Sequence, residues 1–282
     1  VKPIDRPMRI DAHQHFWKYS KDRHVWMTED MQLLKVDHLP PDLKPHLDAC
    51  SMDGCVAVQA DQSENENTFL LGLAEEYSFI KGVVGWVDLK DPGVEARLSQ
   101  YVANPKLKGF RHVLQDEPQR DYMLDPSFVE GVGLLRKYHL TYDLLVFPDQ
   151  LGYTLDFLRQ LPDQPFVVDH IAKPPIKDQK MGDWNKHMTE VAAFDNVYCK
   201  ISGLVTEADW GKWKKEDFHR YLDIVVEQFG VHRIMYGSDW PVCQLAASYQ
   251  QQFDIVADYF STFTESEQAL FFGSNAVKFY QL

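Results

Sequence analysis

The sequence predicts an α/β protein of the (β/α)8 TIM-barrel type. Short apolar runs rich in β-branched residues alternate with longer amphipathic stretches along the 282 residues. This alternation is typical of parallel strands joined by helices, and the length suits one large barrel. Runs such as 83–87 and 166–168 are continuously apolar, as in strands buried on both faces. The eight expected strands cover residues 9–15, 55–60, 81–88, 108–114, 140–147, 165–170, 196–201 and 233–238.

Helical spacing of apolar residues predicts helices over 64–78, 126–138, 216–229 and 269–280. Gly230 is suited to end the third helix, and Thr264 with Glu267 forms a capping box before the fourth. The rival fold is an open doubly wound sheet, which usually has a glycine-rich turn after its first strand. Residues 11–15 contain no glycine. We therefore expect one barrel domain over residues 8–282. Residues 1–7, which precede the natural-looking start at Met8, are expected to be either a leader or an expression remnant.

Composition and charge exclude several classes of protein. Hydrophobic residues make up 45% and charged residues 25% of the chain, which argues against disorder. The net charge of −13 argues against a nucleic-acid partner and against an anionic membrane surface. No apolar run approaches the roughly 18 residues that a membrane helix needs. The four cysteines are scattered, which favours reduced thiols in a cytoplasmic protein.

Ionisable side chains stand at the ends of several expected strands. The first strand ends with His13 and His15, which are two residues apart and so face the same way. His170 ends the sixth strand, Asp239 follows the eighth, and the fourth carries Arg111 beside His112. Each of these residues alone has an ordinary structural explanation, such as a buried hydrogen-bonded histidine or a turn aspartate. Together they predict an active site, because a barrel brings its strand ends to one face.

These side-chain types suit hydrolysis at an electrophilic carbon. Asp239 can act as the general base for a water molecule. The imidazoles, or a metal that they hold, can polarise a carbonyl and stabilise the oxyanion. The sequence has no serine nucleophile elbow, no Walker loop and no dinucleotide-binding fingerprint, so three other enzyme classes are disfavoured.

The chain resembles the amidohydrolase superfamily, in its amidohydrolase-2 branch and close to the sugar lactonases for L-fuconolactone and L-rhamnono-lactone. The resemblance covers residues 8 to about 280 and is carried by 9–17, 85–89, 108–118, 169–174, 200–204 and 235–241. It implies a distorted barrel of the amidohydrolase type, with a site built from His13, His15, His170 and Asp239. Asp239 would activate water, and Arg111 and His112 would lie around the substrate.

The sequence departs from the metal-dependent members of that family. Those members usually add a histidine at the end of the fifth strand, or a bridging lysine or glutamate on the fourth. Here the expected fifth strand has no histidine, and the fourth offers Arg111 and His112 instead. His13, His15 and Asp239 are a thin ligand set for zinc, which usually takes three protein ligands and water. Two mechanisms therefore remain open. One needs no cofactor, with Asp239 as the base and histidines as electrophiles, and the other uses one divalent metal, with zinc as the first choice.

Aromatic side chains near the strand ends are candidates for the wall of a sugar-binding pocket. We expect Trp17, Trp86 and Trp240 to contact the substrate, with Trp210 and Trp213 as further candidates and 207–213 as a lid. The expected function is a lactonase of carbohydrate metabolism that acts on a small sugar lactone. The alternatives are a zinc-dependent amidohydrolase or decarboxylase and a non-catalytic binding barrel. A homo-oligomer is left open.

Overall fold

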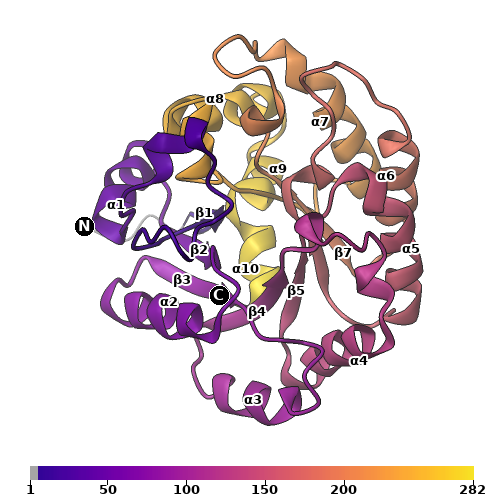
Figure 1. Cartoon of the computed structure of the whole chain (residues 1–282). Coiled ribbons are helices and arrows are strands. Elements are labelled where there is room, and N and C mark those ends of the chain that lie inside the picture. The colour runs from indigo at the N-terminus through magenta and orange to yellow at the C-terminus, as the bar shows by residue number, and fades with distance from the viewer. Residues whose placement is uncertain (1–5) are drawn as a thin grey trace.

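The computed structural model describes residues 6–282 and contains a barrel of eight parallel strands (Figure 1). Each strand pairs with the next along the chain, and the helices lie outside the strands. All eight expected strands are confirmed, with ends that differ from the expected ones by at most three residues. Their bounds are β1 Ile10–Gln14, β2 Gly54–Val58, β3 Ile80–Gly85, β4 Leu107–His112, β5 Thr141–Leu144, β6 Phe166–Val168, β7 Val197–Ile201 and β8 Ile234–Tyr236.

The four expected helices are also present. α7 has the expected bounds and ends before Gly230, and Thr264 caps α9 as predicted. The expected helix over 269–280 is interrupted by a wider turn at Leu270–Ser274, where Gly273 lies against the backbone of Met8. The helices are α1 Pro40–Ala49, α2 Glu64–Glu76, α3 Val94–Tyr101, α4 Pro126–Leu135, α5 Leu151–Gln160, α6 Trp184–Ala192, α7 Glu216–Phe229, α8 Tyr249–Phe260, α9 Glu265–Ala269 and α10 Asn275–Tyr280.

The core has two layers because side chains alternate along each strand. Alternate strand residues pack outward against the helices, and the others fill the barrel. The inner layer includes Val56, Val84, Val167 and Met235, and it packs against Phe279 and neighbouring residues of α10. The last residues also contact the start of β4, where Lys108 Nζ donates to the carbonyl of Gln281 at 2.7 Å. The C-terminal helix therefore closes the barrel at the end opposite the expected site.

An irregularity in β1 turns the expected site residues inward. Ile10 and Ala12 belong to the inner layer, so strict alternation would point His13 outward. The pairing with β2 shifts its register between Asp11 and Gln14, as at a β-bulge. A bulge places two successive side chains on one face. His13 therefore joins Ala12 inside the barrel.

Backbone bonds join β1 to the segment after β8. Asp239 N–H donates to the carbonyl of His13, and His15 N–H donates to the carbonyl of Trp240, both at 2.8 Å. The buried carboxylate of Asp11 accepts from Ser238 N–H at 2.9 Å and from Tyr249 O–H at 3.0 Å. Burial raises the pKa of Asp11 to about 6. These contacts fix Asp239 beside the two histidines of β1.

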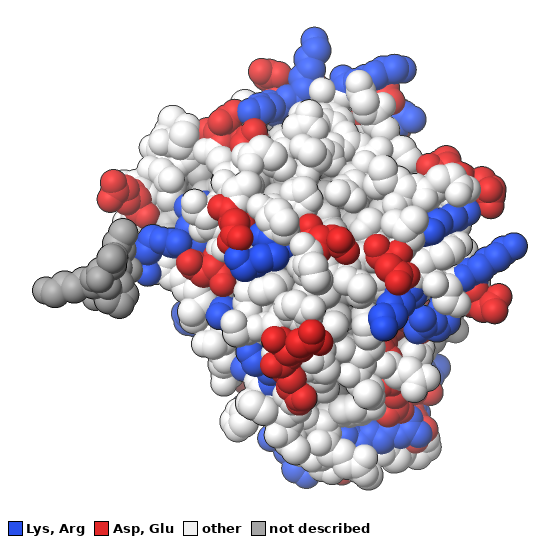
Figure 2. All heavy atoms as spheres, turned by 90° about the vertical axis from the view of Figure 1, so that its left-hand side faces the viewer, with Lys and Arg blue, Asp and Glu red and all other residues white. Residues whose placement is uncertain are grey.

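The surface carries mixed charge. Acidic and basic side chains are interspersed on the face in Figure 2, with no large basic area on that face. All four cysteines are buried and free. Within residues 6–282, no helix is long and apolar enough to cross a membrane. Residues 1–5 of the expected leader or remnant lie outside the described residues.

Candidate active site

A cavity of about 590 Å³ lies over the C-terminal ends of the strands. It has the size of an ordinary small-molecule site. His15, His170 and Asp239 line its floor, and His13 is fully buried just beneath them. The wall is formed by Trp17, Arg23, Val25, Trp26, Met31, Gln59, Ala60, Asp61, Gln62, Arg111, Val113, Gln115, Asp116, Glu117, Leu145, Lys173, Thr206, Glu207, Trp210, Val242 and Leu245.

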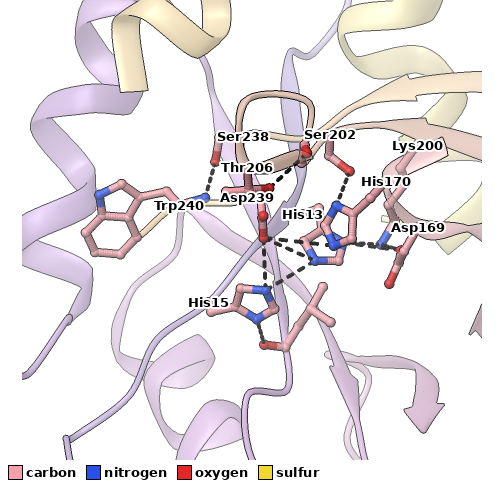
Figure 3. Close-up of polar contacts among 12 residues, drawn as sticks. His13, His15, Asp169, His170, Lys200, Ser202, Thr206, Ser238, Asp239 and Trp240 are labelled. Carbon is pink, nitrogen blue, oxygen red and sulfur yellow. Dashed lines mark hydrogen bonds and ion pairs between the residues drawn. The ribbon is translucent and has the colours of Figure 1, made fainter. Parts of the chain in front are cut away.

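Three imidazoles converge on one carboxylate oxygen (Figure 3). Asp239 Oδ1 lies 3.4 Å from His15 Nε2, 3.9 Å from His13 Nε2 and 4.0 Å from His170 Nε2. The two histidines of β1 also contact each other, with 3.2 Å between their Nε2 atoms. The structure therefore brings together the four residues of the expected catalytic set.

The backbone around these side chains is unusual. Asp239 has a φ of 57°, and the four successive residues 170–173 all have φ between 48° and 56°. Residues other than glycine rarely adopt this left-handed region, and each instance costs about 1–3 kcal/mol. Strained backbone of this kind is concentrated at functional sites. In this chain it sets the direction of the two side chains that follow β6 and β8.

Two glycines are required by close packing against the imidazoles. A Cβ atom on Gly237 would lie 2.6 Å from Cβ of His13. A Cβ atom on Gly203 would lie 2.6 Å from Nδ1 of His170, and Gly203 also has a positive φ of 62°. Larger residues at either position would displace a histidine of the site.

Burial controls the protonation of the site. It lowers the pKa of His13 and of His170 well below the ordinary histidine value. Burial by itself would raise the pKa of Asp239, but the imidazoles of His170 and His15 outweigh it and keep that pKa below its usual value. At neutral pH, His13 and His170 are therefore neutral and Asp239 is a carboxylate, the form that can accept a proton from water.

A layer of buried charges lies beneath the histidines. The layer has four members. Arg111 lies on β4, Asp143 on β5 and Lys200 on β7, and Asp169 directly follows β6. Arg111 Nη1 is 3.1 Å from Asp169 Oδ2, and Lys200 Nζ is 2.6 Å from Asp143 Oδ2. The sequence analysis gave Asp143 and Lys200 no role. The sequence signal that could have identified them is a charged residue at an inward position of an otherwise apolar strand, because such a charge is costly to bury without a partner.

The donor atoms on the cavity floor were tested for a metal site. Asp239 Oδ1 lies 3.9 Å from His13 Nε2 and 4.0 Å from His170 Nε2, somewhat more than the spacing of about 3.3 Å between donor atoms around tetrahedral zinc. A ligating histidine normally donates its other N–H to a carboxylate or carbonyl. Nδ1 of His13 lies 3.1 Å from the ammonium of Lys200 and 3.3 Å from the carboxylate oxygen Asp169 Oδ1. The carboxylate is the usual partner of a ligating histidine, but the shorter contact is with the ammonium, which can only donate, so this contact disfavours His13 as a metal ligand.

A second group of possible ligands is already filled by a lysine. Ligand atoms of His13, Asp143 and Asp169 also lie within 4.8 Å of one another. Lys200 Nζ contacts all three residues at 2.6–3.1 Å. The ammonium thus takes the place that a cation would occupy there.

The expected substrate contacts divide into two groups. Trp17, Arg111 and Trp210 line the cavity, and the lid candidate contributes Glu207, which pairs with Lys173 at 3.2 Å. Trp26 and Met31, which the sequence analysis did not select, line it as well. They come from the stretch after β1, where spacing gave no indication of direction.

Four other candidates are placed elsewhere. His112 and Trp86 are not among the residues that line the cavity. His112 bonds Glu117, a residue of the wall, at 2.7 Å, accepts from Trp86 Nε1 at 3.3 Å and stacks on Tyr122. Trp240 is buried against other aromatic rings, and Figure 3 shows it pointing away from the imidazoles. Trp213 bonds the carbonyl of Ala246 instead.

Known proteins resemble this chain over nearly its full length. An L-fucono-1,5-lactonase of Burkholderia multivorans is 38% identical, covering 98% of this chain and 96% of the relative. One of Burkholderia ambifaria is 35% identical, covering 97% and 96%. Crystal structures of a B. multivorans amidohydrolase, with bound HEPES and with bound zinc, superpose with a TM-score of 0.93 at 38% identity, covering 98% of this chain and 99% of that chain. The amidohydrolase family model matches residues 10–282. The chain therefore belongs to the amidohydrolase family.

Proposed function

We propose that this protein is a sugar lactonase, which opens the ester ring of an aldonolactone such as L-fucono- or L-rhamnono-lactone with water activated on Asp239. The observation that carries the proposal is the convergence of three imidazoles on Asp239 Oδ1 at the floor of the cavity. The lactonase names of the two Burkholderia relatives support the substrate class.

The reaction follows from the charges on these groups. The carboxylate of Asp239 accepts a proton from water while the water oxygen bonds to the lactone carbonyl carbon. The carbonyl oxygen becomes an oxyanion, which N–H groups of the buried imidazoles and Arg111 stabilise. The ring C–O bond then breaks, and its oxygen takes the proton from Asp239. Lactone and water are thereby converted into an open-chain hydroxy acid.

The cavity wall suits an uncharged, polyhydroxylated ring. Trp17, Trp26 and Met31 contribute an apolar side, which suits the apolar face of a sugar. The described lining residues include five carboxylates, Asp61, Asp116, Glu117, Glu207 and Asp239, against three cations, Arg23, Arg111 and Lys173. The excess of acceptors favours hydroxyl donors over a substrate that is itself a carboxylate.

The test is a panel of sugar lactones assayed with a pH indicator, because each turnover releases an acid. Asp239→Asn should lower kcat by about 10²- to 10⁴-fold on the best substrate. The matched control is Asp156→Asn, a change at an exposed position of α5 that should leave kcat unchanged. Near-normal hydrolysis by Asp239→Asn would remove that residue from the role of base.

A zinc-dependent amidohydrolase or decarboxylase is the second candidate, favoured by the spacing of His13, His170 and Asp239. Zinc, when bound, would act as a Lewis acid on the substrate oxygen. Metal content and activity should be measured on protein purified without chelator and again after chelation. Full activity without metal would eliminate the zinc-dependent version. Loss on chelation with recovery on added zinc would eliminate the metal-free lactonase.

A further inference from the structure

The layer of charges beneath the cavity is positioned to act on His13. Lys200 and Asp143 are fully buried, and neither lines the cavity, so neither touches a bound substrate. Tyr280 of α10 donates to Asp143 from the opposite end of the barrel, at 2.9–3.0 Å. Buried ammonium and carboxylate groups are retained only where they are paired and hydrogen-bonded. The contacts of the ammonium indicate what it does.

The ammonium faces one nitrogen of His13. Lys200 Nζ lies 3.1 Å from His13 Nδ1 with hydrogen-bond geometry. A lysine ammonium has donors only, so this nitrogen must be the acceptor. A neutral imidazole with an accepting Nδ1 carries its proton on Nε2.

The contacts of His15 lead to the same tautomer by an independent route. His15 Nδ1 lies 2.8 Å from the carbonyl of Val58, which can only accept, so His15 carries its proton on Nδ1. In neutral His15, Nε2 is then a lone pair, which lies 3.2 Å from His13 Nε2 and 3.4 Å from Asp239 Oδ1, a carboxylate oxygen that cannot donate to it. A hydrogen bond between the two Nε2 atoms requires the proton on Nε2 of His13.

We propose that Lys200 is a positioning residue that holds His13 in its Nε2–H tautomer, with the proton directed at the cavity floor. Donation from the ammonium to Nδ1 polarises the ring and makes Nε2–H a stronger donor. The use of this donor on a lactone carbonyl rests on the proposed function, but the tautomer itself does not. Held in this form, His13 has no lone pair on Nε2 for a metal.

The opposite tautomer has its own potential partners. Asp169 Oδ1 lies 3.3 Å from His13 Nδ1, and Arg111 Nη1 lies 3.4 Å from Nε2. However, Asp169 Oδ1 is already paired with the ammonium of Lys200 at 3.1 Å. Arg111 makes its shorter bonds elsewhere, to Asp169 Oδ2 at 3.1 Å and to the carbonyl of Gln59 at 2.6 Å. Removal of the ammonium should let His13 turn its proton toward Asp169.

Two variants isolate the ammonium. Lys200→Met with Asp143→Asn removes one positive and one negative charge, so the buried charges stay balanced. Asp143→Asn alone is the matched control, because it keeps Lys200 and its contact with His13. The two proteins differ only at Lys200, and thermal melting with circular dichroism establishes that each is folded.

The first readout is the tautomer, measured by NMR on protein with ¹⁵N-labelled histidine and no substrate. His13 is assigned by comparison with His13→Gln. We expect a protonated Nε2 in the wild type and in Asp143→Asn, and a protonated Nδ1 in the double variant. A protonated Nδ1 in the wild type would overturn the proposal even if neither variant folded. An unchanged tautomer in the double variant would also overturn it.

The second readout is zinc binding by calorimetry. The double variant should bind zinc at least tenfold more tightly than Asp143→Asn, because a turned His13 offers Nε2 to the metal. Equal affinity would contradict the proposal. Failure of the wild type to hydrolyse any sugar lactone would overturn the proposed function instead, and it would leave both of these measurements interpretable.

Discussion

The buried carboxyl group of Glu66 should make the stability of the protein depend on pH. Its side chain is 2% exposed at the start of α2, and Oε1 accepts from Ala60 N–H at 2.9 Å. This bond supports the loop 59–62, which lines the cavity. Burial raises the pKa of Glu66 from 4.5 to about 7, with a smaller contribution from the charge of Asp61 that outweighs the opposing one from Arg23.

A raised carboxyl pKa makes the folded state hold its proton more tightly than the unfolded state. The resulting stabilisation is complete below pH 4.5, and it is lost as the pH rises toward 7. At 1.36 kcal/mol for each pKa unit, the loss amounts to about 3 kcal/mol. Glu66→Gln keeps an oxygen that can accept from Ala60 and has no charge to bury. We therefore expect the variant to gain stability over the wild type as the pH rises.

Denaturant unfolding at pH 5 and pH 8, followed by tryptophan fluorescence, measures this difference. The free-energy difference between Glu66→Gln and the wild type should grow by about 2–3 kcal/mol between the two pH values. Glu75→Gln, at an exposed position of the same helix, is the control and should show no such growth. A difference for Glu66→Gln that is constant with pH would refute the assignment of a buried, proton-holding carboxyl.

Two further substitutions separate activity from stability. Gly237→Ala should lower kcat by at least tenfold, because the new Cβ would meet Cβ of His13 at 2.6 Å and displace the imidazole. A displacement of 1 Å can cost about 10²-fold in rate. Steady-state kinetics on the best lactone checks this, with circular dichroism to establish that the variant is folded. Thr264→Ala should lower the free energy of unfolding by about 1 kcal/mol, because it removes the acceptor for Glu267 N–H at the start of α9. Its kcat should be unchanged, and a change in kcat would contradict the prediction that this cap affects stability alone.

The sequence was most informative where one physical constraint acts on every residue of a segment. A strand buried on both faces must be apolar throughout, and segments such as 166–168 therefore predicted their own structure. That the strand ends carrying His13, His170 and Asp239 lie at one face of the barrel followed from its topology. Because buried strands are apolar throughout, the predicted bounds of individual strands differ from the observed ones by only a few residues.

Side-chain direction could not be derived in the same way. His112 and Trp86 stand near strand ends, but their ring nitrogens bond each other and Glu117, and of these three residues only Glu117 lines the cavity. Trp26 reaches the cavity from an irregular stretch where no periodicity constrains it. These outcomes depend on which neighbour satisfies a polar atom, and that neighbour is often distant along the chain.

The position of His13 shows why a strand pattern alone was insufficient. Inward positions of β1 are apolar at Ile10 and Ala12, and continued alternation would have placed His13 among the outer side chains. The register shift after Asp11 brings His13 inside the barrel, where its Nδ1 contacts Lys200 of β7. Lys200 is also paired with Asp143 and Asp169, but only the register shift brings His13 Nδ1 within reach of its ammonium. The buried charges beneath the cavity are therefore best understood as part of what makes His13 a directed donor, and the tautomer of that one ring connects the fold to the chemistry.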